Sequence, residues 1–333
     1  MYHEDGPARS SPPWAANIIH TCMGVEPGER VLIVVDEPLR FALDPLLAEA
    51  LEAGPVELWT FTFSNAARPF TEFPGQVLDL ATQMEAVVTL LSSFDPVVEL
   101  PAHVAARSII TSGNPRYAVG AYIDQGILEH ELSADYEQIS ALTHSLADRL
   151  QGSSSVHVTT PLGTDLRLSV AGRDWRTDTG ILRGHGVYGN LPAGEVFVAP
   201  VEDSAEGVLM VDKSLPGLKL SEPVRLVFEE GRVVSIEGDP GAGYLEGAIR
   251  EGEQEPEGER ARTIAELGIG TNPRARLQGN LMTDEKVAGT MHVAIGRNDF
   301  RGGKNLAPVH IDRVVSEPTL RVDGDLIAES EQA

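Results

Sequence analysis

Short apolar runs alternate with segments of helical periodicity over the first half of the chain, and this alternation constrains the fold more than any other feature of the sequence. The run 31–35, Val-Leu-Ile-Val-Val, has the length and unbroken hydrophobicity of a strand buried on both faces. Residues 39–53 carry leucine and alanine at helical spacing and end at Gly54. Further strands are predicted at 56–63 and 86–91, and further helices at 77–83 and 135–150. Because parallel strands are joined by crossover helices, the pattern predicts a doubly wound parallel α/β sheet.

The pattern changes at the polar segment 151–155, Gln-Gly-Ser-Ser-Ser. After it, strands with alternating side chains flank tight turns, at 156–170 and again at 224–236. A β-rich texture of this kind is typical of an α+β domain with antiparallel sheets. The sequence therefore predicts an N-terminal α/β domain over 1–150 and a β-rich domain over 151–333. The candidate metal-binding and catalytic residues described below all lie in this second domain.

The chain is strongly acidic. It has 26 Lys and Arg against 50 Asp and Glu, a formal charge of −24. The most acidic stretch, 251–259, is predicted to be a solvated loop between helices near 242–250 and 260–264. Such a surface repels phosphate backbones and anionic lipids, so neither nucleic acid nor a membrane is expected as a partner.

Targeting and redox features are few. The apolar runs are strand-sized, shorter than the ~20 residues of a spanning helix. The segment 1–14 lacks the charged-then-apolar order of a signal peptide, so a cytoplasmic location is expected. The single cysteine, Cys22, excludes an intrachain disulfide and a metal site built from cysteines alone.

Two histidines lie in strand-like apolar runs near the C-terminus. In the run 308–315, His310 and Asp312 are two residues apart, so on a strand both point to the same face. This pair is either half of a metal site or a buried histidine paired to a carboxylate for structural reasons. His292 lies in the run 290–296 and is either a core histidine or a second ligand, on a strand adjacent to that of His310.

Two glutamates occupy positions where packing alone favours an apolar residue. Glu266 lies among small and apolar neighbours, where an unpaired charge costs several kcal/mol. Glu195 enters a strand after a Pro/Gly turn and is either a ligand or an edge residue in water. Asp284 and Glu285 precede Lys286 and are expected at the exposed start of a helix.

Two histidines with carboxylates and no thiolate form a mixed nitrogen and oxygen donor set, which suits Zn, Co, Mn or Fe(II). Nearby, Arg297, Arg301 and Lys304 surround Gly302-Gly303 in an otherwise acidic chain. These residues either bind the anionic group of a substrate or belong to a solvated hairpin loop. The sequence contains no Gly-x-Ser-x-Gly elbow, no Walker loop and no His-Glu-x-x-His motif.

Taken in chain order, a set of segments resembles the aminopeptidase T and aminopeptidase S group of metallo-aminopeptidases. The resemblance covers nearly the whole chain, and the ordered set is more specific than any single segment. The segments are 24–31 (Gly-Val-Glu-Pro-Gly-Glu-Arg-Val), 160–166, 190–197, 266–273 (Glu-Leu-Gly-Ile-Gly-Thr-Asn-Pro), 284–296 and 310–324.

This resemblance implies a homodimeric, metal-dependent aminopeptidase-like hydrolase that releases N-terminal amino acids from peptides. It implies two divalent metals per chain (Zn, Co or Mn), one bridging hydroxide that attacks the peptide carbonyl, and a metal that holds the free amine of the substrate. Carried over by position, the metal ligands are Glu195, Glu266, His292, His310 and Asp312, with Glu195 and Glu266 also as catalytic candidates.

The resemblance departs at Asp299, where the aminopeptidase site uses a tyrosine. An iron-dependent enzyme, 2,5-dihydroxypyridine dioxygenase, is similar in fold and implies an alternative: one Fe(II) per chain held by two histidines and one carboxylate. Here these are His292, His310 and Asp312, and the basic residues beside them suit an acidic aromatic substrate. A third alternative is a non-catalytic relative that binds peptides.

Overall fold

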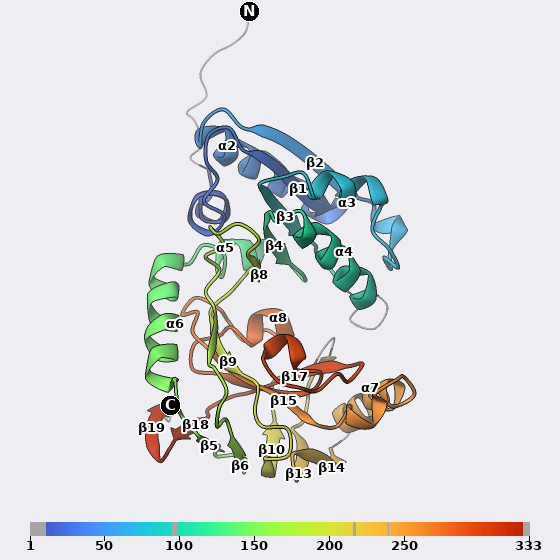
Figure 1. The fold of residues 1–333 in the computed structure, drawn as a ribbon, viewed down its shortest axis with the longest axis vertical. Coiled ribbons are helices and arrows are strands. Elements are labelled where there is room, and N and C mark those ends of the chain that lie inside the picture. The colour runs from blue at the N-terminus through green and yellow to red at the C-terminus, as the bar shows by residue number, and fades with distance from the viewer. Residues whose placement is uncertain (1–10, 95–98, 216–217, 239, 329–333) are drawn as a thin grey trace, which may run out of the picture. The chain divides into compact units, whose positions relative to one another are not determined.

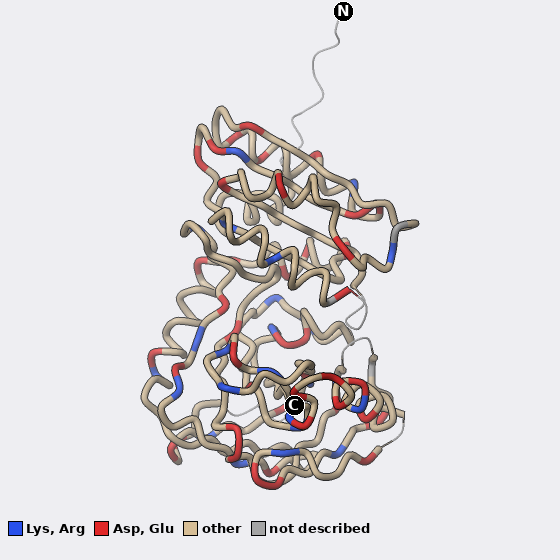
Figure 2. Tube along the Cα trace, turned by 45° about the vertical axis from the view of Figure 1, so that its right-hand side comes forward, with Lys and Arg blue, Asp and Glu red and all other residues tan. Residues whose placement is uncertain are grey.

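The computed structural model describes residues 11–94, 99–215, 218–238 and 240–328, and it divides into two compact units (Figure 1). The N-terminal unit consists of Met1–Glu137 and Gly180–Leu191, and the C-terminal unit of Gln138–Thr179 and Pro192–Ala333. Acidic residues are spread along the chain trace of both units (Figure 2). No helix in the described part of the chain is long and apolar enough to cross a membrane.

A five-stranded parallel sheet in the order β2-β1-β3-β4-β8 forms the N-terminal unit. From β1 the chain passes through α2 to one neighbouring strand and returns through α3 to the other. Because parallel crossovers are right-handed, this reversal places helices on both faces, as a doubly wound sheet requires. The strands are β1 (Arg30–Asp36), β2 (Glu57–Phe63), β3 (Ala86–Leu90), β4 (Arg116–Gly120) and β8 (Tyr188–Asn190), and the helices α1 (Pro13–Ala16), α2 (Leu43–Glu52), α3 (Gly75–Ala81), α4 (Leu100–Ser112) and α5 (Gln125–Glu129).

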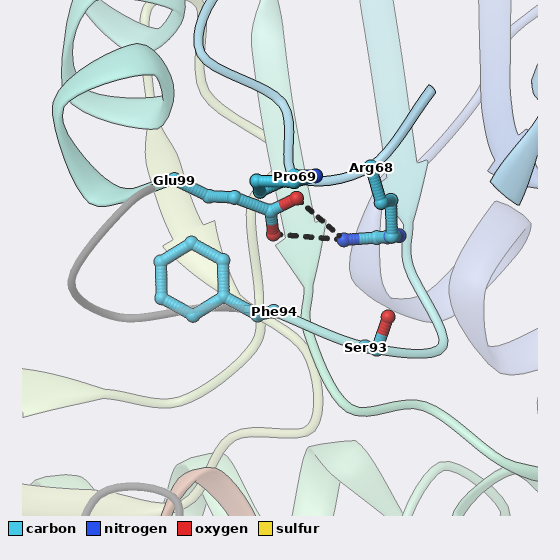
Figure 3. A pocket seen from close by; sticks show the side chains of 5 residues that line it. All are labelled: Arg68, Pro69, Ser93, Phe94 and Glu99. Carbon is cyan, nitrogen blue, oxygen red and sulfur yellow. Dashed lines mark hydrogen bonds and ion pairs between the residues drawn. The ribbon is translucent and has the colours of Figure 1, made fainter. Parts of the chain in front are cut away.

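A cavity of about 320 Å³ lies beyond the carboxyl ends of β1 and β3 (Figure 3). Two of its lining residues are paired: Nη1 of Arg68 donates to both oxygens of Glu99 at 3.0 and 2.8 Å. The Nη2 atom of Arg68 lies 2.9 Å from a carboxylate oxygen of Asp36, the last residue of β1. The cavity is lined by Arg68, Pro69, Ser93, Phe94 and Glu99.

The C-terminal unit is built from two larger antiparallel sheets that share one apolar core. A seven-stranded sheet has the order β14-β13-β10-β6-β5-β18-β19, and a five-stranded sheet has the order β17-β16-β15-β9-β7. The first sheet contains β5 (Ser155–Thr159), β6 (Asp165–Ser169), β10 (Glu206–Val211), β13 (Val224–Glu229), β14 (Arg232–Glu237), β18 (Thr319–Val322) and β19 (Asp325–Ala328). The second contains β7 (Arg176–Asp178), β9 (Glu195–Val198), β15 (Ile264–Gly270), β16 (Met291–Gly296) and β17 (His310–Val315).

A short ribbon and helices complete the unit. They are the ribbon β11 (Ser214–Leu215) and β12 (Leu218–Lys219), and the helices α6 (Tyr136–Leu150), α7 (Gly241–Glu253) and α8 (Leu281–Asp284). The first two residues of α6 belong to the N-terminal unit.

The sequence-based fold class is confirmed, with local differences. A single boundary near 150 was expected. In the structure the N-terminal unit ends near 137, and the chain returns to it over 180–191, where β8 pairs with β4. The acidic stretch at 251–259 begins as the last turn of α7. The helix expected at 260–264 is wrong, because Ile264 begins the fully buried strand β15 and only Gly258–Arg260 forms a helical turn.

Candidate metal centre

One face of the five-stranded sheet carries the candidate ligands, and the other face lies in the core. Along β15, Glu266 alternates with Leu267, and along β16, His292 alternates with Val293. Since neighbouring residues of a strand point to opposite faces, the aliphatic members pack into the core and the polar members share the second face. The alternation of polar and aliphatic residues in these runs is therefore the local cause of the site.

The strand register brings small residues between the polar ones. Ala294 lies between Glu266 and Asp312 in the ladder, Gly268 pairs with His292, and Gly296 pairs with His310. A Cβ atom on Gly268 would lie 2.0 Å from Cε1 of His292, so the imidazole lies directly over this glycine. The small residues leave room for side chains to converge above the sheet.

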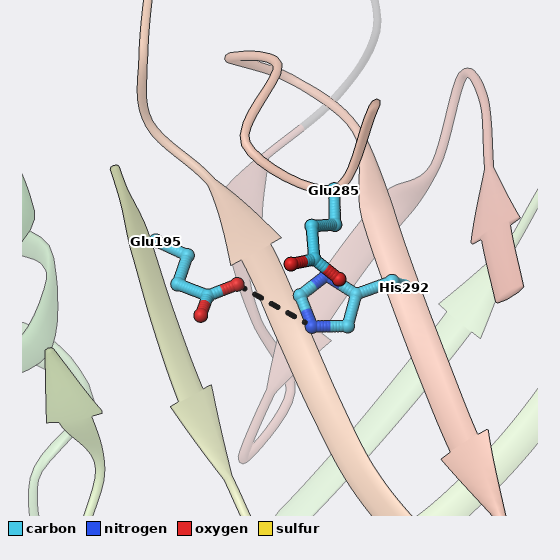
Figure 4. A group of neighbouring side chains, drawn as sticks. All are labelled: Glu195, Glu285 and His292. Carbon is cyan, nitrogen blue, oxygen red and sulfur yellow. Dashed lines mark ion pairs between the residues drawn. The ribbon is translucent and has the colours of Figure 1, made fainter. Parts of the chain in front are cut away.

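Two groups of donor atoms result, and within each group the atoms lie within 4.8 Å of one another. The first consists of Glu266, His310 and Asp312, and the second of Glu195, Glu285 and His292. Figure 4 shows the second group, with the imidazole reaching from β16 across β15 toward the glutamate on β9.

The carboxylate of Glu266 connects the two groups. Its Oε1 lies 3.7 Å from Nε2 of His292, and its Oε2 lies 3.3 Å from Nε2 of His310. His292 and His310 are on adjacent strands, as predicted, but the register offsets them, since His310 pairs with Gly296 and His292 with Val314. The two imidazoles therefore meet at one carboxylate and do not face each other as a direct cross-strand pair.

Several polar atoms of this cluster are buried without a hydrogen-bond partner among the described residues. They are Oε2 of Glu195, both carboxylate oxygens of Glu266, Nδ1 of His292 and Nε2 of His310. Burying such atoms unpaired is costly, and a bound cation would satisfy the oxygens and the imidazole nitrogen together. The donor set of imidazoles and carboxylates fits Fe(II), Zn, Co or Mn.

A hydrogen bond orients the ring of His310. Its Nδ1 lies 2.6 Å from the carbonyl oxygen of Arg297. A carbonyl oxygen only accepts, so Nδ1 carries the proton and Nε2 faces Glu266 and Asp312. A hydrogen bond from the ring nitrogen that does not face the metal, here Nδ1, commonly fixes the orientation of a metal-binding imidazole.

The charges of the cluster shift the pKa values of its histidines. Burial lowers the pKa of His292, but the neighbouring carboxylates of Glu266 and Glu195 outweigh burial and raise the pKa to about 9. Burial likewise opposes protonation of His310, and Asp312 and Glu266 raise its pKa to about 10. Each imidazole must lose a proton before its nitrogen can bind a metal.

Glu285 and Lys286 are residues of the cluster that sequence reasoning did not assign to the site. Asp284 and Glu285 were expected at an exposed helix start, but Asp284 and Lys286 are fully buried and Glu285 is 6% exposed. The ammonium of Lys286 lies 2.8 Å from Oε1 of Glu195 and 2.9 Å from Oε1 of Glu285. Burial, which the charge of Lys286 opposes, raises the pKa of Glu285 to about 7.

The basic residues differ in their relation to the cluster. Arg301 places Nε 2.9 Å from Oε2 of Glu266. Arg297 instead pairs with Asp299, the residue at the position of the aminopeptidase tyrosine, and Lys304 is exposed. Of the substrate-binding candidates, the structure therefore brings Arg301 to the predicted ligands.

All the predicted ligands lie in this cluster: Glu195, Glu266, His292, His310 and Asp312. Their grouping differs from the iron triad considered from sequence, because Glu266 is grouped with His310 and Asp312 while His292 is grouped with Glu195. That these residues bind metal stays a prediction.

The fold and the cluster define a two-unit α/β protein with a buried cluster of potential metal ligands. A family model described as 2,5-dihydroxypyridine 5,6-dioxygenase matches residues 15–332, and the chain belongs to this family.

Curated relatives carry two different activities. The 2,5-dihydroxypyridine 5,6-dioxygenase of Pseudomonas putida (strain KT2440) is 28% identical over 202 residues, which cover 55% of this chain and 57% of that protein. Aminopeptidase AmpS of Bacillus subtilis (strain 168) is 27% identical over 185 residues, 49% of this chain and 43% of that protein. The matches thus span about half the length of each relative. Both relatives are enzymes. The second of them, AmpS, is an aminopeptidase, as the resemblance in the sequence implied.

Solved structures share the fold. The 2,5-dihydroxypyridine dioxygenase from Pseudomonas putida KT2440 superposes with a TM-score of 0.73 at 17% identity, covering 95% of this chain and 94% of that chain. AmpT from Thermus thermophilus also gives a TM-score of 0.73, at 19% identity, covering 95% and 96%. The same architecture therefore occurs in proteins of both names.

Proposed function

We propose that this protein is a non-haem Fe(II)-dependent, ring-cleaving dioxygenase that acts on a planar, anionic aromatic substrate of the 2,5-dihydroxypyridine type. Glu266, His310 and Asp312 would hold the metal, and His292 faces Glu266 from the other side. When bound, Fe(II) would supply activation of dioxygen for insertion of both oxygen atoms into the ring.

The observation that carries this proposal is the surroundings of Arg301. Its guanidinium carbon lies 4.5 Å from the ring centroid of Phe197 and 5.1 Å from that of Phe300. The ring of Phe300 in turn lies 5.1 Å from the imidazole of His310. The guanidinium of Arg301 beside the candidate ligands attracts an anionic ring and repels the ammonium group of a peptide N-terminus. The neighbouring phenyl rings offer faces against which a planar substrate ring can pack.

Family membership supports the same reaction. The matching family model and the curated relative from Pseudomonas putida carry the name of one ring-opening dioxygenase. Because the sequence identity is low, the name of that relative indicates the class of substrate that we propose for this protein and not the exact compound.

A second candidate function is a two-metal aminopeptidase with Zn, Co or Mn. The observation that favours it is the second donor group, Glu195, Glu285 and His292, next to the first. A cation in this group would share Glu195 and Glu285 with the ammonium of Lys286.

Metal content and turnover, measured on the same preparation, separate the two candidates. Protein purified anaerobically without chelator is analysed for metal per chain, then assayed for oxygen consumption with 2,5-dihydroxypyridine and for release of leucine from a leucyl amide. About one iron per chain with oxygen uptake matched to loss of the ring absorbance supports the dioxygenase. Two Zn, Co or Mn per chain with leucine release supports the aminopeptidase and overturns our proposal, as does the absence of both activities.

A matched pair of histidine variants tests the site. His310→Ala should lose metal and turnover together. His157→Ala removes a histidine of the same unit that pairs with Asp165 at 2.8 Å, outside the cluster, and should keep both. Equal metal content in His310→Ala and the wild type would refute the assignment of the metal site.

A further inference from the structure

Two basic side chains neutralise the candidate metal centre, and they are held very differently. Lys286 is fully buried and has carboxylate oxygens of Glu195, Glu285 and Asp178 within 3.6 Å. Arg301 is 23% exposed and approaches one carboxylate, that of Glu266. The ammonium of Lys286 is therefore a fixed part of the site, whereas the guanidinium of Arg301 is partly exposed and, among the described residues, forms its ion pair with Glu266.

The contact between Arg301 and Glu266 is an ion pair without hydrogen-bond alignment. Although Nε of Arg301 lies 2.9 Å from Oε2 of Glu266, neither atom has a hydrogen-bond partner within the described ranges. Arg301 is also the last residue of the short helical turn Asp299–Arg301, and Gly302 follows it with a φ of 99°, a left-handed conformation that favours glycine. The arginine thus lies at the edge of a turn and is not packed into a strand.

A metal ion and Arg301 compete for the same oxygen. Oε2 of Glu266 is 2.9 Å from Nε of Arg301 and 3.3 Å from Nε2 of His310. A cation held between Glu266 and His310 needs this oxygen, and like charges so close repel strongly where little water screens them. Occupation by the metal therefore weakens the ion pair of Arg301 with Glu266.

We propose that Arg301 is an exchangeable counter-ion: it neutralises Glu266 while the site is empty, and it is released to bind the anionic group of the substrate when metal takes Glu266. The inference rests on the proposed function, because it assumes an anionic aromatic substrate. It predicts that metal binds first and that the substrate anion binds only to the metal-loaded protein.

The rings beside Arg301 suit this second role. Phe197 is nearly buried and Phe300 is 40% exposed, and the guanidinium lies near both. A freed guanidinium retains these contacts with the ring faces while its N–H groups form a fork for a carboxylate or phenolate. A planar anion can thus bind Arg301 and pack against the exposed ring of Phe300.

Binding measurements test the exchange without turnover. Calorimetry with benzoate, and with benzamide as its neutral counterpart, is performed on the wild-type protein with and without Co(II). We expect benzoate to bind the Co(II)-loaded protein at least tenfold more tightly than the metal-free protein, and benzamide to show no such difference. Equal benzoate affinity in the two states would overturn the proposal.

Substitution of the arginine separates competition from a structural role. Arg301→Gln should bind Co(II) at least as tightly as the wild type and benzoate at least tenfold more weakly. Arg167→Gln, an equal charge change at a side chain 61% exposed on β6, should match the wild type in both titrations. Weaker Co(II) binding by Arg301→Gln would show that the arginine supports the site and would refute the exchange.

The exchange and the proposed function fail in different ways. If the titrations behave as expected but no ring cleavage occurs, the exchange stands and the reaction is wrong. If ring cleavage occurs with benzoate binding independent of metal, the reaction stands and the exchange is wrong.

Discussion

In the N-terminal unit, the imidazole of His103 packs edge-on between the phenyl rings of Phe73 and Phe94, with centroids 5.0 and 4.8 Å away. Its Nε2 atom is buried and has no hydrogen-bond partner within the described part of the chain. Burial lowers the pKa of His103 to about 4, although the charge of Glu99 acts in the opposite direction. The folded protein therefore resists protonation of this ring.

The free energy of unfolding should depend on pH through His103. The unfolded chain takes up this proton near pH 6.5, and the folded chain only near pH 4, so the stabilisation is complete above pH 6.5 and is lost as the pH falls toward 4. The loss is at most about 3 kcal/mol. His103→Phe keeps the ring packing and cannot be protonated, so urea unfolding at pH 7.5 and 4.5 should show a smaller difference than in the wild type. An unchanged difference would contradict the assignment to His103.

Individual residues also show where sequence reasoning succeeds and where it fails. His310 and Asp312 were recognised because their spacing on a strand is a local property. Glu285 and Lys286 were not, because a short run of charges near a helix end is usually exposed. Their burial depends on Glu195 and Asp178, about a hundred residues earlier in the chain, which supply the opposite charges.

At the scale of elements, one face of strand β16 packs into the apolar core and the other face lies toward the donor cluster. Val293 and Ile295 are buried in the apolar core, whereas His292 and Ala294 face the donor cluster. Substitutions on the two faces should therefore have different effects.

Ile295→Ala should lower the free energy of unfolding by about 2 to 5 kcal/mol and leave the metal content of the folded protein unchanged. Ala294→Leu places a large side chain between Glu266 and Asp312 and should lower metal affinity at least tenfold. Denaturant unfolding and metal titration of both variants check the pair. Loss of metal by Ile295→Ala in its folded state would contradict the separation of faces.

The strands of this sheet were only partly predictable. Alternation predicted strand character near His292 and His310, and it explains which residues share a face. The register was not predictable, because the pairing of Gly296 with His310 depends on the loop between β16 and β17, and the pairing of Glu266 with Ala294 depends on a bulge in β15. The meeting of both imidazoles at Glu266 required the folded sheet.

At the scale of the whole molecule, each unit has its own apolar core. Residues of one cluster come from the parallel sheet and its helices, and those of the other from the two antiparallel sheets. The candidate ligands, from Glu195 to Asp312, all belong to the C-terminal unit. Two cores of this kind permit two unfolding transitions.

Metal loading should stabilise the C-terminal unit and so raise the melting temperature of one of these two transitions. A metal at a hundred times its dissociation constant contributes about 2.7 kcal/mol, which raises the melting temperature of a unit of this size by roughly 5 to 10 °C. Calorimetry of the metal-loaded protein and of protein treated with chelator should show this shift in one transition and none in Glu266→Gln. An equal shift in Glu266→Gln would contradict the site.

The return of the chain over 180–191 has a consequence for synthesis on the ribosome. Strand β8 completes the parallel sheet by pairing with β4, yet it is translated only after β5, β6 and β7 of the other unit. At ordinary elongation rates, the outer edge of β4 therefore stays unpaired for several seconds until β8 has been synthesised. During that interval the nascent N-terminal unit exposes an unpaired strand edge, the feature that most readily templates aggregation. Slow translation over this stretch would prolong that exposure, and a chain ended near residue 150 would retain it permanently.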